Sequence, residues 1–272
     1  MVLFVSQIEK GNAQDSINGK PSPILTFFGN GDMQKSLDEG EKLPANTGLG
    51  VSYRQLYAPG VGKGLLWKFV DRLELEATIN VASNVDTIIA AYDSTFVTNN
   101  SEFGSSILTP LNSGQAIKIG LRLNFDRSRL VRLIDGVKAK YVGSNRNWMA
   151  MEGTTPKVIK ATNNCLRVGL FHEFIPKNLL DDYSINLAVN LAYNSVKGDV
   201  GLEQNGALRQ SLMGSSAKKF LGPEVSLEIR LRNLKAEFAY SWLQSKTEVP
   251  GLTGGRMVTT ISFIGGFGLG LR

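Results

Sequence analysis

The feature that most constrains this chain is a strict alternation of apolar and polar or small residues. Between residues 117 and 125 every second residue is apolar. These apolar residues are Ile117, Ile119, Leu121, Leu123 and Phe125. Because successive side chains of a β-strand point to opposite faces, the pattern predicts a strand with one apolar and one polar face. The alternation recurs in nine further segments: 23–29, 47–57, 73–81, 136–147, 164–175, 183–194, 224–231, 234–242 and 257–271.

Composition narrows the class of protein. Hydrophobic residues make up 42% of the 272 residues and charged residues 20%, which is too apolar for a disordered chain. No stretch approaches the ~20 consecutive apolar residues of a transmembrane helix. The net charge of +6 comes from dispersed basic residues, so no basic stripe for nucleic acid is expected. Cys165 and His172 are the single cysteine and histidine, so we expect no disulfide, no histidine-rich metal site and no cofactor.

The lengths of strands and connections favour a membrane barrel. Most predicted strands have about 10–14 residues, and a tilted transmembrane strand needs about 9–11. The predicted connections have about 17, 13, 32, 9, 16, 7, 22, 2 and 10 residues, so each odd-numbered connection is longer than the next one. Outer-membrane barrels have short periplasmic turns and longer outer loops. The sequence therefore predicts an all-β, up-and-down antiparallel transmembrane β-barrel of about ten strands, with both termini periplasmic.

The apolar face carries almost no charge, and its larger aromatic residues fall near segment ends. These are Tyr53, Tyr57, Tyr141, Tyr183, Tyr193, Tyr240 and Trp242. Aromatic girdles of membrane barrels lie at such positions. Alternation alone does not tell the inside of a barrel from its outside. A water-soluble barrel that binds an apolar ligand is therefore the alternative fold.

The polar face predicts a network of charges in the lumen. Its principal members are Glu74, Glu76, Lys118, Arg122, Glu228, Arg230, Lys235 and Glu237. Further candidates on this face are Arg54, Lys138, Lys140, Arg167, Glu173, Glu224 and Arg232. Unpaired charges in a barrel interior are costly, so we expect ion pairs with a structural role. Glu74 and Glu76 could serve acid–base chemistry only if a substrate entered the lumen, and no catalytic residue is predicted.

Three segments make the chain resemble small outer-membrane β-barrel proteins of the Bacteroidota. They are Gly48–Arg54, the turn Val70-Asp71-Arg72-Leu73, and the glycine-rich closing strand Ile261–Arg272. The resemblance covers residues 23–272 and implies a bacterial outer membrane as the location, with lipid as a partner. Residues 1–16 are interpreted as a truncated signal peptide or a disordered N-terminus, and residues 17–272 as one barrel domain.

Three hypotheses for function follow. The first is a non-enzymatic structural or accessory subunit of an outer-membrane protein complex, which implies protein partners. The second is a narrow channel for small solutes or ions, in which a positive lumen favours anions. The third is a lipid-active surface enzyme that uses His172, although this residue is expected on the lipid-facing side near the inner end of its strand.

Overall fold

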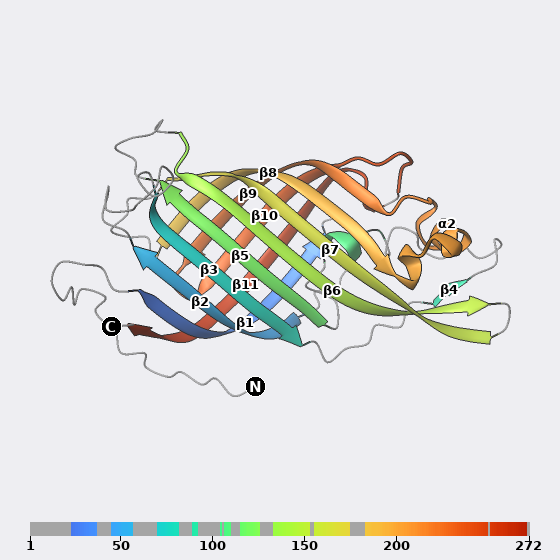
Figure 1. Cartoon of the computed structure of the whole chain (residues 1–272), viewed down its shortest axis with the longest axis horizontal. Coiled ribbons are helices and arrows are strands. Elements are labelled where there is room, and N and C mark those ends of the chain that lie inside the picture. The colour runs from blue at the N-terminus through green and yellow to red at the C-terminus, as the bar shows by residue number, and fades with distance from the viewer. Residues whose placement is uncertain are drawn as a thin grey trace.

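The structure is a computed structural model that describes residues 23–36, 45–56, 70–81, 89–91, 104, 106–109, 115–125, 133–152, 155–174, 183–249 and 251–270. Ten long antiparallel strands form one closed ring (Figure 1). They are β1 (Ile24–Ser36), β2 (Ala45–Leu56), β3 (Val70–Val81), β5 (Gln115–Phe125), β6 (Gly136–Glu152), β7 (Thr155–Glu173), β8 (Tyr183–Gly198), β9 (Lys219–Leu231), β10 (Leu234–Leu243) and β11 (Gly254–Gly270). The predicted up-and-down barrel of about ten strands is confirmed.

Pairing of the first and last strands closes the barrel. β1 and β11 are antiparallel from Ile24–Gly270 to Ser36–Val258. A Cβ atom on Gly266 would lie 2.3 Å from the carbonyl oxygen of Phe27, so the glycine allows β11 to approach β1 closely. The glycine-rich sequence of the closing strand therefore serves the seam of the barrel.

The two ends of the barrel differ. We call the end where Ile24 pairs with Gly270 the terminal end, and the opposite end the cap end. Smaller elements gather at the cap end (Figure 1). They are the short strand β4 (Ile89–Ala91), which runs parallel to β6, the turns η5 (Asp199–Gly201) and η6 (Glu203–Asn205), and helix α2 (Gly206–Met213). Within the described residues, no helix is long and apolar enough to cross a membrane.

The predicted alternation of connection lengths is wrong at two places. Connections at the cap end have 8, 33, 2, 20 and 10 residues, and those at the terminal end have 13, 10, 9 and 2. The first cap-end connection is shorter than expected because β1 continues to Ser36. The third has two residues because β6 and β7 stay paired as far as Glu152 and Thr155. The two longest connections still lie at the cap end.

The β6–β7 hairpin extends past the other strands (Figure 1), and its sequence pattern explains why the prediction misses this. Trp148 and Ile159 are buried on the inner side. Apart from Val158, the outward residues whose burial is described here, among them Asn145, Asn147 and Lys160, are polar. An outer face in contact with water needs no apolar residues, so the apolar–polar contrast that marks a transmembrane strand is lost.

The outer surface of the barrel is an apolar band. Exposed apolar side chains come from most of the strands, among them Ile79, Ile117, Ile119, Leu166, Val168, Leu170, Val189, Leu191, Val225 and Phe263. Such a band around a closed ring suits contact with hydrocarbon and would be unfavourable in water. The barrel therefore spans a membrane, and the alternative of a water-soluble barrel with an apolar interior is wrong.

Aromatic residues lie at both edges of this band. Tyr141, Tyr193, Tyr240 and Trp242 face outward in the cap-end halves of their transmembrane segments, and Tyr53 and Tyr183 near the terminal end. The Tyr141 hydroxyl donates a hydrogen bond to Oδ1 of Asn164, 2.6 Å away. The next outward positions toward the cap on β6 and β7 include Asn145, Thr162 and Asn164, so this tyrosine marks the boundary between the apolar band and water on this hairpin. Tyr57 lies outside the described residues.

The apolar band leads to a test with two matched valines. Val189 lies in the middle of the band and is 58% exposed, whereas Val158 lies on the projecting hairpin and is 59% exposed. We expect Val189→Arg to lower the free energy of unfolding in lipid vesicles by about 2–4 kcal/mol, since a guanidinium must enter the hydrocarbon. We expect Val158→Arg to change it little. Equal effects in urea titrations of the two variants would contradict a lipid-facing band.

Candidate functional site

The terminal half of the lumen contains a charged cavity of about 160 Å³. All eight principal residues of the predicted charge network line it: Glu74, Glu76, Lys118, Arg122, Glu228, Arg230, Lys235 and Glu237. Six further charged residues contribute to the wall, and these are Arg54, Arg72, Lys138, Lys140, Arg167 and Glu173. The alternation of the strands thus brings charges from seven strands into one space.

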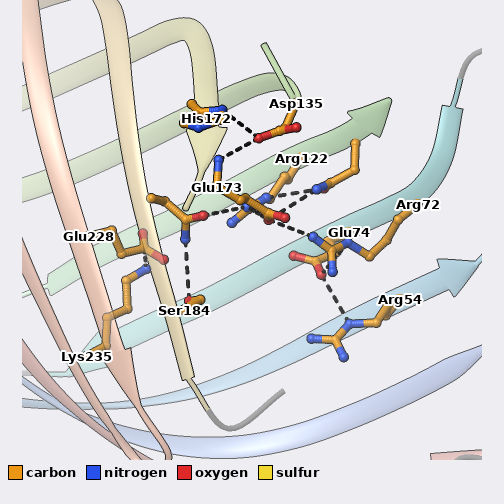
Figure 2. A network of polar contacts seen from close by, with 12 residues as sticks. Arg54, Arg72, Glu74, Arg122, Asp135, His172, Glu173, Ser184, Glu228 and Lys235 are labelled. Atoms are coloured by element: carbon orange, nitrogen blue, oxygen red, sulfur yellow. Dashed lines mark hydrogen bonds and ion pairs between the residues drawn. The ribbon is translucent and has the colours of Figure 1, made fainter. Parts of the chain in front are cut away.

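Glu173 is the centre of the network at the terminal end (Figure 2). Its side chain is 2% exposed, and its Oε1 forms ion pairs with Arg72 Nη2 at 2.8 Å and with Arg122. Asn124 Nδ2 donates to the same oxygen at 3.2 Å. Arg122 also donates to Oδ1 of Asn186 at 3.1 Å. A buried carboxylate with two cations and an amide donor is well compensated, and it joins β3, β5, β7 and β8.

A second carboxylate extends this network along β3. Glu74 Oε1 lies 3.1 Å from Arg54 Nε and 3.3 Å from Arg72 Nε (Figure 2). Arg72 therefore lies between Glu74 and Glu173. The sequence pattern omits Arg72 because the recognisable alternation starts at Leu73, whereas β3 begins at Val70. Even-numbered residues of β3 point into the lumen, and this alternation could have identified Arg72 as a lumen residue.

The β9–β10 hairpin places like charges opposite one another. Glu228 pairs in register with Glu237, and Arg230 with Lys235. Directly opposed like charges destabilise a sheet. The diagonal ion pair between Lys235 Nζ and Glu228 Oε2, at 2.9 Å, relieves part of this repulsion. Glu76 is compensated similarly by Lys118 on the neighbouring strand, 2.8 Å away.

Other contacts cross the lumen between strands that are not neighbours. Lys140 on β6 forms an ion pair with Glu237 on β10, with Nζ and Oε2 2.9 Å apart. Lys138 Nζ donates to Ser226 Oγ on β9 at 3.1 Å. Arg167 Nε on β7 meets Glu224 Oε2 on β9 at 2.7 Å. These side chains connect strands that are not adjacent and fill part of the interior between them.

The cap half of the lumen has an apolar core, with buried polar residues such as Asn80, Asn163 and Asn194 on its wall. Its buried cluster consists of Ile107, Leu108, Trp148, Ile159, Ala161, Ala192, Val196, Val200, Leu208, Leu212, Met213, Phe220, Leu243, Val249, Leu252 and Val258. Ile107 and Leu108 are fully buried and come from the long connection between β3 and β5. The carbonyl oxygen of Ile107 lies 3.6 Å from Sγ of Cys165, an inward residue of β7. This connection therefore enters the barrel, which sequence analysis does not predict.

The connection between β8 and β9 covers this apolar cluster. Arg209 of α2 is buried and donates to the carbonyl oxygens of Ser216 at 3.1 Å and Val200 at 3.0 Å. It also donates to that of Leu202. At the surface, Lys218 hydrogen-bonds to Glu203 and lowers the pKa of that carboxyl from its usual value. A single guanidinium thus holds three parts of the connection together, so the cap is a packed structure.

His172 lies on the outside of the barrel at the terminal end. Its Nδ1 is 2.9 Å from Oδ2 of Asp135 (Figure 2). Its ring meets that of Phe174 edge-on. The same Asp135 oxygen accepts a hydrogen bond from the backbone N–H of Glu173 at 2.7 Å. Neither Asp135 nor Phe174 carries a hydroxyl or thiol group that His172 could activate as a nucleophile. Among the residues that the structure describes, no group of three or more histidine, cysteine, aspartate or glutamate side chains could hold a metal ion.

Comparisons with known proteins assign no family to this chain. No protein-family model and no curated protein sequence matches the chain. OmpT, an outer membrane protein of Vibrio cholerae, aligns at 10% identity and a TM-score of 0.24, covering 96% of this chain and 100% of that chain. The attachment invasion locus protein Ail of Yersinia pestis aligns at 10% identity and a TM-score of 0.20, with coverages of 91% and 98%. OmpF of Salmonella typhi aligns at 11% identity and a TM-score of 0.21, with coverages of 89% and 97%.

The class of protein therefore follows from the barrel itself. An even number of antiparallel strands, a closed ring, an apolar outer band with aromatic edges and a charged interior define an outer-membrane β-barrel of the bacterial type. The bacterial outer membrane is where such a barrel lies, in agreement with the sequence analysis. The finer resemblance to Bacteroidota proteins stays a prediction.

The buried network yields a test with a matched surface control. We expect Glu173→Gln to lower the free energy of unfolding by about 3–5 kcal/mol, because Arg72 and Arg122 lose the charge that compensates them. Glu203→Gln removes an ion-paired carboxylate whose side chain is 86% exposed, and we expect little change. Urea titration in lipid vesicles measures both. A Glu173→Gln barrel as stable as the Glu203→Gln barrel would show that the network does not hold the terminal end together.

Proposed function

We propose that this chain is a non-enzymatic structural or accessory subunit of an outer-membrane protein complex. The observation that supports this proposal most directly is that side chains fill the interior of the barrel. Ile107 and Leu108 lie in an apolar cluster in the cap half of the lumen, and ion pairs cross the terminal half. A barrel filled in this way acts through its outer surface and its ends, where other proteins can bind.

The orientation is part of this proposal. Both ends of the strand ring, Ile24 and Gly270, lie at the terminal end, and the two longest connections lie at the cap end. In bacterial barrels the longer connections face the outside of the cell, and the short turns face the periplasm. We therefore assign the cap to the outside of the cell and both termini to the periplasm.

Extraction from native membranes tests the role as a subunit. In mild detergent we expect the chain to elute in an assembly larger than its own 29.6 kDa, with the same co-eluting proteins in repeated preparations. Recombinant chain in the same detergent provides the size of the isolated barrel. Elution of the native chain at that isolated size would contradict the proposal.

A narrow anion channel is the second candidate, and the excess of lysine and arginine around the cavity favours it. Bilayer recordings separate the two functions. We expect the wild-type chain to give no ion conductance, because the apolar cluster interrupts any polar path through the barrel. We expect Ile107→Asp/Leu108→Asp to produce conductance, since the carboxylates disfavour the apolar cluster.

Cys165 supplies the control for this recording. It is the single cysteine and is fully buried beside Ile107, so a water-soluble thiol reagent should label it only in the double variant. Steady conductance of wild-type protein in which Cys165 stays unlabelled would favour the channel. A labelled double variant without conductance would show that the terminal half also blocks ions.

A further inference from the structure

The charged cavity carries more cations than carboxylates. Nine lysine and arginine side chains line it, against five glutamates. Glu224, which pairs with Arg167, adds one carboxylate behind this lining. Within the part of the chain that the structure describes, the cavity therefore keeps an excess of three positive charges.

Two residues account for most of this excess. Each of the other seven cations has a glutamate partner within 4.0 Å. Lys138 instead donates to the neutral hydroxyl of Ser226 at 3.1 Å. Arg230 donates to the carbonyl oxygen of Arg232 at 3.5 Å. Neither contact supplies a negative charge, and among the described residues neither cation forms an ion pair with a carboxylate within 4.0 Å.

The cavity has the room and the chemistry for an anion. Its volume of about 160 Å³ is well above the ~10–15 Å³ that one water requires. An enclosed cation without a counter-charge is unfavourable, and an anion in the cavity would remove this penalty. A guanidinium offers paired donors that match the oxygens of phosphate or sulfate, and an ammonium adds a point charge.

We propose that the terminal half of the lumen is a binding site for a small oxyanion of the phosphate or sulfate class, held by Lys138 and Arg230. Both side chains line the cavity, from β6 and β9. The ion is a free anion or a small ester, because a lipid headgroup tethered in the bilayer does not reach the inside of the ring. This site does not depend on the role as a subunit of a complex.

Calorimetric titration of the full chain in detergent tests the site, with inorganic phosphate as the probe in a low-salt buffer. We expect saturable binding at one site. We expect Lys138→Met/Arg230→Met to weaken it at least tenfold, and Lys197→Met, which removes an exposed cation at the cap end, to change it less than twofold. Absence of saturable binding to the folded wild-type chain, or equal affinity in the double variant, would overturn the proposal.

A third variant tests whether phosphate binding depends on the charge of the cavity or only on an intact cavity wall. Glu228→Gln frees Lys235 and raises the positive excess by one. We expect phosphate to bind several-fold more tightly to this variant, whereas a change that only disturbs the wall would weaken binding. Weaker binding in Glu228→Gln would therefore count against an electrostatic site. Sulfate in place of phosphate should compete for the same site, and failure to compete would contradict the class of ligand.

Discussion

The whole structure depends on backbone hydrogen bonding in a solvent that offers none. In hydrocarbon every strand needs a neighbour on both edges, and only a closed ring provides this. The seam between β1 and β11, from Ile24–Gly270 to Ser36–Val258, is therefore a requirement of the membrane. Closure joins the first and last segments of the barrel, and glycines such as Gly266 permit the close approach at this seam.

Closure also decides where the polar residues go. Once one face of each strand meets lipid, the other face must enter the lumen, whatever its charge. The two-residue turn between β9 and β10 fixes the register of that hairpin, so Glu228 comes to lie opposite Glu237. The repulsion is relieved diagonally by Lys235 and across the lumen by Lys140. The ion pairs are thus consequences of register, and those that cross the lumen connect its walls.

The sequence predicts the transmembrane segments because lipid on one side and charge on the other impose a strong contrast. It predicts that Glu228 and Lys235 belong to one charge network in the lumen, because the alternation places both on the polar face. It does not predict the contact of Arg122 with Glu173, which depends on how strands far apart in sequence meet inside the ring. It also misses Ile107 and Leu108, since their connection has no periodicity and its burial depends on the barrel around it.

The division of the lumen into two zones bears on what the barrel can do. A pore requires a continuous polar path, and here the residues from the β3–β5 connection place apolar side chains across that path at the cap end. The β3–β5 connection that places these side chains belongs to the same chain. The β8–β9 connection, whose parts Arg209 holds together, covers it. The terminal zone remains polar, with cations in excess. A barrel closed on one side and cationic on the other is suited to retaining an anion inside.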